Sequence, residues 1–145
     1  MVNFDTEHLK VALERELEDY KIVSNQVAFS IIDQRALSTG LVDLCKAHNV
    51  HLLCYGTLLG GFFAESWVGK EEPSRHFLDT LKNWSLIKYK NVIDQWGGWA
   101  LFQELLQVLR QVADKHRVSI SNVAAYDLHR MQLIFPETTF WPNLK

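Results

Sequence analysis

The segment from residue 21 to residue 55 constrains the fold more than any other part of the sequence. Its first part, KIVSNQVAF, predicts a short strand, and DQRALSTG then breaks the regular pattern. LVDLCKAHN predicts a short helix that ends at Asn49, and VHLLCY predicts the next strand. Strands joined by a helix through short connections run parallel in one sheet, so the sequence predicts a βαβ unit and an α/β fold.

Composition indicates one globular domain over residues 1–145. The chain has 48% hydrophobic and 22% charged residues, both ordinary values, and its length supports one core. A net charge of −2 gives no basic surface for nucleic acid or anionic lipid. The N-terminus, MVNFDTEHLK, has no apolar core of signal-peptide length, and no run approaches the roughly 18 apolar residues of a membrane span. We therefore expect a cytoplasmic protein without nucleic-acid or membrane partners.

Two cysteines and two histidines recur at a uniform spacing and form a candidate zinc ligand set. They are Cys45, His48, His51 and Cys54. The first two belong to the predicted helix and the last two to the following strand, where they would point to opposite faces. We therefore expect no metal site, and we interpret the cysteines as thiols without a disulfide framework.

A second cluster combines lysines with aromatic residues, as in sites that stack single-stranded nucleic acid. It contains Lys82, Trp84, Lys88, Tyr89 and Lys90. Acidic residues nearby and the negative net charge argue against that function, so we assign none to the cluster.

Helices are predicted on both sides of the βαβ unit. Asp5 or Thr6 can cap a first helix, whose apolar positions are Leu9, Ala12, Leu13, Leu17 and Tyr20. The segment from Phe63 to Gly98 has little strand character, and we interpret it as a long functional loop. An amphipathic helix follows, with apolar positions Trp99, Phe102, Leu105, Leu106, Leu109, Val112 and Ala113, and Ser119 or Ser121 starts another.

The end of the second predicted strand is a candidate binding site. VHLLCY ends at Tyr55, and Gly56, Gly60 and Gly61 follow. A strand that ends on an aromatic residue and continues into glycines usually stops beside something that the backbone must approach closely. Taken alone, a tyrosine at a strand end is more often half buried, with its hydroxyl in water.

Four segments resemble, in order and spacing, the C-terminal half of aldo-keto reductases: VNFDTEHL, IVSNQVAFSIIDQR, LVDLCKAHNVHLLCYGTLLGGF and IDQWGGWALFQELLQVLRQVADKHRVSISNVA. The resemblance covers about residues 2–124. It implies a partial (β/α)8 TIM barrel in which Val2–Phe4 ends the fifth strand, Ile22–Val27 is the sixth and His51–Tyr55 the seventh. Active sites of such barrels lie at the C-terminal ends of the strands.

The resemblance implies a nicotinamide cofactor, usually NADPH. Asn3 and Gln26 would hydrogen-bond the carboxamide, and Tyr55 would stack on the ring. The loop after Tyr55 would lie along the pyrophosphate, where glycines let backbone N–H groups come close. The implied cofactor-binding residues are Asn3, Gln26, Tyr55, Gly56, Thr57, Leu58, Gly60 and Gly61.

The catalytic groups of the family have no match in this sequence. The family uses a Tyr acid, an Asp and a Lys that tune it, and a His that orients the carbonyl. A phenol with a pKa of about 10 must be perturbed to donate its proton at neutral pH. All four groups belong to the first four strands of the barrel, and the matched place of Tyr55 is beside the cofactor ring. We therefore assign no catalytic residue.

The sequence also departs from the family within the matched region. Val2 replaces the usual Ser or Thr, and Ser66 lies where relatives often carry a Lys that faces phosphate. After about Ala124 the match fades into a divergent tail, residues 125–145, in which Leu133–Pro136 is a vestigial eighth strand at most. The Arg-rich segment that grips the adenosine 2′-phosphate is absent, so any NADP(H) binding should be weak.

Two functions remain open. The chain is an oxidoreductase fragment that is inactive alone, or a non-catalytic interaction or regulatory module built on a half-barrel; a remnant of an active ancestor is a third interpretation. A half-barrel leaves two strand edges open and exposes inner-face apolar groups. We therefore expect a homo-oligomer, in preference to a tail (Phe135–Pro142) that folds back over one edge.

Overall fold

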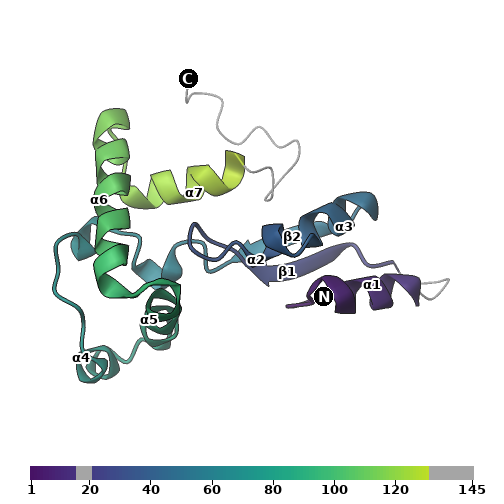
Figure 1. Cartoon of the computed structure of the whole chain (residues 1–145), viewed down its shortest axis with the longest axis horizontal. Coiled ribbons are helices and arrows are strands. Elements are labelled where there is room, and N and C mark those ends of the chain that lie inside the picture. The colour runs from purple at the N-terminus through teal and green to yellow at the C-terminus, as the bar shows by residue number, and fades with distance from the viewer. Residues whose placement is uncertain (16–20, 131–145) are drawn as a thin grey trace.

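The computed structural model describes residues 1–15 and 21–130 of the chain. Within them the fold is mixed α/β, with a small parallel sheet and mostly helices. Figure 1 shows the sheet with α1, α2 and α3 at one end of an elongated molecule, and α4, α5 and α6 at the other. The predicted positions Leu17 and Tyr20, and the segment Leu133–Pro136, lie outside the described residues.

The sheet consists of β1 (Ser24–Ala28) and β2 (His51–Tyr55), which run parallel and pair Ser24 with His51 through to Ala28 with Tyr55. The predicted βαβ unit is thus confirmed. The first strand begins at Ser24 and not at Ile22, because pairing starts where the amide of His51 donates to the carbonyl of Val23. Val2 adds an isolated parallel bridge to Gln26 at the other edge of β1.

Three helices accompany the sheet. They are α1 (Thr6–Glu14), α2 (Arg35–Ser38) and α3 (Leu41–Ala47). Asp5 caps α1 as predicted, since its side chain accepts a hydrogen bond from the His8 amide at 2.9 Å. The predicted helix at 41–49 is confirmed, and Asn49 follows it with a φ of 55°. The segment DQRALSTG was predicted only to interrupt the regular pattern, but it also contains the short helix α2.

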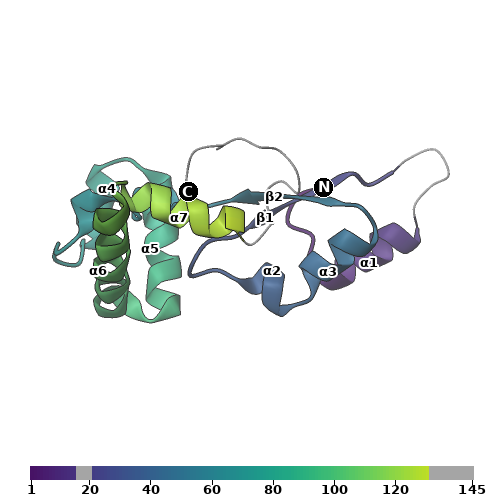
Figure 2. The same cartoon turned by 90° about the horizontal axis from the view of Figure 1, so that it is seen from above.

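The helices cover one face of the sheet, as Figure 2 shows. The core on that face contains Leu9, Val27, Phe29, Ala36, Leu41, Val42, Cys45, Val50 and Leu52. On the opposite face Gln26 and Leu53 pair in register and are both exposed. This open face was expected to be apolar. It is mixed instead, because strand alternation places Ser24, Gln26, Ala28, His51, Leu53 and Tyr55 there.

The second half of the described chain is helical. Two 3-10 turns, η1 (Leu59–Gly61) and η2 (Glu65–Trp67), lead into α4 (Arg75–Thr80), α5 (Trp84–Trp96), α6 (Gly98–His116) and α7 (Ile120–Arg130). Their separate core includes Phe62, Phe63, Leu78, Ile93, Phe102, Leu106, Ile120 and Ala124. The two helices predicted after Gly98 are therefore confirmed.

The interpretation of residues 63–98 as a long loop was wrong. This segment contains η2, α4 and α5, and both helices begin at a capping side chain. The Ser74 hydroxyl accepts from the Phe77 amide at 3.1 Å, and the Asn83 carboxamide accepts from the Ser85 amide at 3.1 Å. None of the helices in the described ranges is long and apolar enough to cross a membrane.

Candidate functional site

Three of the predicted cofactor residues lie together at the C-terminal end of the sheet. The hydroxyl of Tyr55 donates to the carboxamide oxygen of Asn3 at 2.9 Å, across 52 residues of sequence. The backbone amide of Asn3 donates to the carbonyl of Gln26 at 2.6 Å. Gln26 and Tyr55 point to the same face because Gln26, the middle residue of β1, pairs with Leu53, and Tyr55 lies two residues further along β2. Asn3, Gln26 and Tyr55 are called the strand-end triad below.

A buried asparagine holds Asn3 in place. Asn25 has no exposed surface, and its side-chain nitrogen donates to the carbonyl of Phe4 at 2.8 Å. Its side-chain oxygen accepts from the amide of Phe4 at 3.3 Å. These two bonds tie the N-terminal segment to β1, and Asn3 takes a left-handed backbone with a φ of 56°.

The ring of Tyr55 lies beside a lysine from the helical half of the molecule. The Lys88 ammonium on α5 is 5.1 Å from the centroid of the Tyr55 ring and 5.2 Å from that of Tyr89. Both distances suit a cation–π contact. A positive charge therefore stands next to the aromatic residue that ends β2.

Tyr89 also explains two of the glycines that follow β2. A Cβ atom on Gly56 would overlap the hydroxyl of Tyr89, and a Cβ on Gly60 would lie 2.7 Å from Cδ2 of its ring. Both glycines have positive φ, 74° and 63°, which glycine adopts without strain. Gly61 has a φ of 107° and meets no atom within 4 Å at its Cβ position.

Several amides of the glycine loop are used within the loop itself. The amide of Leu59 donates to Gly56, and that of Gly61 to Leu58. Thr57 and Leu58 are partly exposed, and Leu58 packs against the helical core. The loop is therefore a pair of tight turns against α5, and its predicted contact with a pyrophosphate stays a prediction.

Charged groups lie close to the two tyrosines. Asp33 binds Arg35 through two hydrogen bonds of 2.7 and 2.8 Å, and these bonds lower the pKa of the Asp33 carboxyl. Desolvation by burial raises the pKa of Tyr89, and the charges of Tyr55 and Asp33 add to that rise. The phenol of Tyr89 therefore stays protonated at neutral pH.

The cysteines are separate thiols. Cys45 is buried in the core below the sheet, and burial raises its pKa to about 11. Cys54 is partly buried, and burial raises its pKa as well. Among the residues that the structure describes, no group of three His, Cys, Asp or Glu side chains could hold a metal ion.

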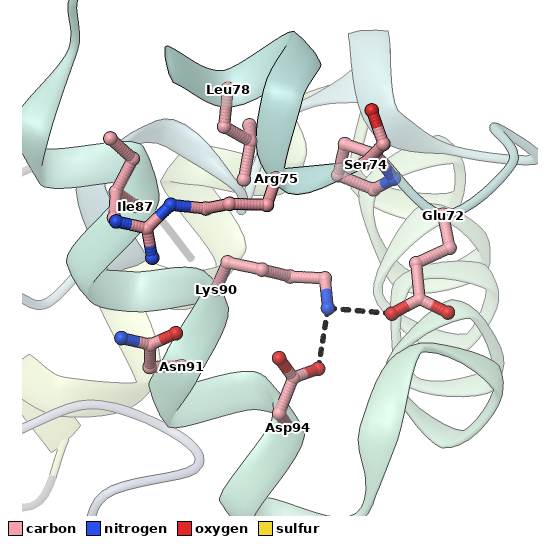
Figure 3. Close-up of a pocket in the computed structure, with 9 residues that line it drawn as sticks. Glu72, Ser74, Arg75, Leu78, Ile87, Lys90, Asn91 and Asp94 are labelled. Atoms are coloured by element: carbon pink, nitrogen blue, oxygen red, sulfur yellow. Dashed lines mark hydrogen bonds and ion pairs between the residues drawn. The ribbon is translucent and has the colours of Figure 1, made fainter.

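A cavity of about 410 Å³ lies in the helical half, apart from the strand-end triad. Its lining residues are Glu72, Pro73, Ser74, Arg75, Leu78, Ile87, Lys90, Asn91 and Asp94. Figure 3 shows the Lys90 ammonium between two carboxylates, at 2.6 Å from Glu72 and 2.5 Å from Asp94. Burial lowers the pKa of Lys90, but these hydrogen bonds outweigh it and leave the pKa raised. Because the Lys90 ammonium already binds both carboxylates, it is not free to bind a ligand in this cavity.

Sequence reasoning missed Lys88 and Tyr89 as neighbours of Tyr55. Both belong to the lysine and aromatic cluster that was weighed for nucleic acid and given no role. Lys88 and Tyr89 are more than thirty positions from Tyr55 in the sequence. The local sequence could indicate only that they belong to a helix, α5, and not which strand that helix contacts. Lys90 of the same cluster is buried and binds acidic side chains instead.

Comparison with known proteins gives a family and a distant relative. The model of the Aldo/keto reductase family matches residues 1–136. Flagellar radial spoke protein 5 of Chlamydomonas reinhardtii is 29% identical over 124 residues. The alignment covers 86% of this chain and 22% of that protein, so the chain spans about a fifth of the relative. Because the family model matches most of its length, this chain belongs to the aldo/keto reductase family.

Proposed function

We propose that the chain is an aldo-keto reductase-like module that binds a nicotinamide dinucleotide weakly and does not reduce carbonyls by itself. In this proposal β1 and β2 correspond to the sixth and seventh strands of a (β/α)8 barrel, and Val2 to the end of the fifth. The observation that carries it is the bond from Tyr55 to Asn3, which joins the strand-end triad at the C-terminal end of the sheet. That is the end at which barrel active sites lie.

The residues fit the ring end of such a cofactor. The Asn3 carboxamide accepts from the Tyr55 hydroxyl, and Gln26 lies on the same face of the sheet, so both offer amide donors and acceptors that match a carboxamide on a flat ring. When bound, the cofactor would supply hydride chemistry. This chain would contribute binding and orientation of its ring.

The phosphate end fits less well. Tyr89 fills the space beside Gly56 and Gly60, and the turns of the loop use part of its amides. Lys88 is a cation close to the tyrosine pair, whereas Ser66 stands where relatives often carry a Lys that faces phosphate. NADPH should therefore bind weakly, with little advantage over NADH, because the segment that grips the 2′-phosphate has no match.

A test of catalysis measures NADPH oxidation with a simple aldehyde, using protein freed of host reductases. We expect no steady oxidation, because the Tyr acid, its Asp and Lys partners and the orienting His all lack counterparts. One general acid is worth about 10²–10⁴-fold in rate, and here the whole set is missing. Turnover of about 1 s⁻¹ or more would overturn the proposal, since this is an ordinary enzymatic rate. The Tyr55→Ala variant, which removes the stacking ring, shows whether any residual activity belongs to this chain.

A second candidate is a non-catalytic interaction module in the cytoplasm. The open face of the sheet favours it, because Gln26 and Leu53 are exposed where a complete barrel would cover them. The relative's name places that protein in the flagellar radial spoke, which is consistent with a role in assembly. A chain that binds no nicotinamide dinucleotide at millimolar concentration would favour this candidate over the first.

A further inference from the structure

Helix α6 has a second apolar row besides the face that it buries. The buried face consists of Trp99, Phe102, Leu106, Leu109 and Ala113. The second row consists of Leu101, Leu105, Val108 and Val112, and it is called the α6 stripe. Leu101, Val108 and Val112 are 41%, 55% and 39% exposed, and Leu105 is partly buried. A row of exposed apolar side chains along one side of a 19-residue helix is a candidate contact surface.

The stripe has the spacing of a helix–helix seam. Its residues follow one another at intervals of four, three and four positions, which is the pattern of the core positions of a coiled coil. Figures 1 and 2 show α6 in the helical end of the molecule, far from α1 and the sheet. A second helix could therefore approach α6 without displacing the sheet.

The stripe is a better docking surface than the open face of the sheet. The sheet face carries two exposed aliphatic side chains, Leu53 on β2 and Val2 at the edge beside Gln26, among polar and small residues. The stripe carries four aliphatic side chains in one row, of which three are exposed and Leu105 packs partly against the helical core. The apolar surface that a partner chain would cover therefore lies on α6 and not on the strands.

Charges beside the stripe indicate that its partner is a second copy in antiparallel orientation. Glu104 and Lys115 are exposed, and their separation equals about three helical turns, so they lie on the same side of α6. Glu104 flanks the stripe near Leu101, and Lys115 lies one turn beyond Val112. This side of α6 therefore carries an acidic residue towards its N-terminus and a basic residue towards its C-terminus. When a second copy of α6 lies antiparallel to the first, the acidic end of each helix faces the basic end of the other.

We propose that two copies of this chain associate through their α6 stripes, with the helices antiparallel and a two-fold axis close to Val108. In this arrangement Leu105 of one copy packs near Val112 of the other, and Val108 meets its own equivalent. Glu104 of each copy comes within about one helical turn, along the axis, of the other copy's Lys115. Antiparallel helices also oppose their macrodipoles favourably. The proposal is independent of cofactor binding.

The contact should be weak. A standard interface buries about 800 Å² on each partner, and four aliphatic side chains on one helix supply less than that. Sedimentation velocity should therefore be run from roughly 5 to 500 µM, the range in which a small interface shows itself. We expect a reversible shift from a 16.8 kDa monomer towards a dimer within this range.

A single substitution at the axis tests the surface. Val108→Glu places two carboxylates against each other, and we expect the dimerisation constant to weaken about tenfold or more. Gln107→Glu is the matched control, because it adds the same charge at an exposed position one residue off the stripe and should change little. Circular dichroism confirms that both variants remain folded, which is expected because both sites are exposed.

Charge reversal tests the orientation. Glu104→Lys alone sets two ammonium groups against each other at each contact, and Lys115→Glu alone sets two carboxylates together, so each variant should self-associate less. In a mixture of the two variants, the introduced lysine of one faces the introduced glutamate of the other, and the unchanged Lys115 of the first faces the unchanged Glu104 of the second. Both contacts then pair opposite charges, so the mixed dimer should form again. The double variant Glu104→Lys with Lys115→Glu restores opposite charges at both contacts and should associate again.

Three outcomes would overturn the proposal. A purely monomeric wild type at 500 µM is one, and a dimer that Val108→Glu leaves intact is another. A dimer that Val108→Glu dissociates but whose affinity the charge variants do not change overturns the antiparallel arrangement.

Discussion

The phenol of Tyr89 occupies the space that a side chain on Gly56 would need. The two residues join α5 to the turn after β2, and they connect the helical half of the molecule to the strand end that carries Tyr55. Lys88, the neighbour of Tyr89, lies over both tyrosine rings. The contact between Tyr89 and Gly56 therefore fixes the position of the candidate site relative to α5.

Replacing Gly56 with alanine should destabilise the fold strongly. The left-handed backbone costs about 1–2 kcal/mol for a non-glycine residue, and the overlap with Tyr89 adds about 1–3 kcal/mol. Gly40→Ala is the control, because Gly40 has nearly the same φ, 75°, and no atom within 4 Å of its Cβ position. Urea unfolding compares the two. Equal losses of free energy of unfolding would show that Tyr89 yields without penalty.

The Lys90 cluster should tolerate loss of one carboxylate better than loss of both. Lys90 is 7% exposed and binds Glu72 and Asp94, so either acid alone still pairs the buried ammonium. We expect Glu72→Gln or Asp94→Asn to cost roughly 1 kcal/mol and the double variant about 3 kcal/mol, because it leaves a buried charge unpaired. Lys90→Met, which removes that charge and keeps the volume, should be nearly neutral. A strictly additive double variant would contradict this account.

The same cluster predicts a dependence of stability on high pH. The pKa of Lys90 is raised in the folded state, so its contribution is complete below the unfolded value of about 10.4. The contribution is lost as the pH rises through the folded pKa. Urea unfolding of wild type and Lys90→Met between pH 8 and pH 11 should show the difference, with the wild type losing more stability above about pH 10. Parallel curves would rule out this contribution.

Cys45 should resist alkylation in the folded protein. Its pKa of about 11 leaves almost no thiolate at pH 8, and the thiolate is the reactive species. Iodoacetamide at pH 8 should therefore modify Cys45 only after unfolding, as followed by mass spectrometry of peptides. Cys54, which is partly buried, should react faster than Cys45. Rapid labelling of Cys45 in the native state would mean that the core below the sheet opens readily.

Asn25 should be more important for stability than its place in a strand suggests. Asn25→Asp removes the donor to the carbonyl of Phe4 and turns a buried oxygen towards it, which should cost about 1–3 kcal/mol or more. The N-terminal segment should then detach from β1, and the Tyr55 hydroxyl should lose Asn3. Amide hydrogen exchange of residues 1–5 measures the detachment. Unchanged protection there would refute this role.

Several elements were predictable from the sequence because their signals are local. The alternation of strand, helix and strand between residues 21 and 55 indicated the parallel pair, and Asp5 marked the start of α1. The helices α4 and α5 were missed although Ser74 and Asn83 are ordinary capping residues. The segment from 63 to 98 lacks strand character, and for that reason it was interpreted as a loop without helices.

The site itself was only partly predictable. Resemblance to the family indicated Asn3, Gln26 and Tyr55, and the structure brings them together. Tyr89 could not be assigned, because a helix periodicity does not say which distant loop its exposed side chains will meet. The role of Asn25 was hidden as well, since a polar residue in a strand gives no sign of its partner.

The central claim is that the strand-end triad binds a nicotinamide dinucleotide weakly and without a grip on the 2′-phosphate. Isothermal titration of the chain with NADPH and with NADH tests it most directly. We predict weak binding of similar strength for both, reduced by roughly 1 kcal/mol in Tyr55→Ala through loss of ring stacking, and unchanged in the remote variant Gln107→Glu. Tight binding with strong preference for NADPH, or binding that Tyr55→Ala leaves intact, would contradict the account.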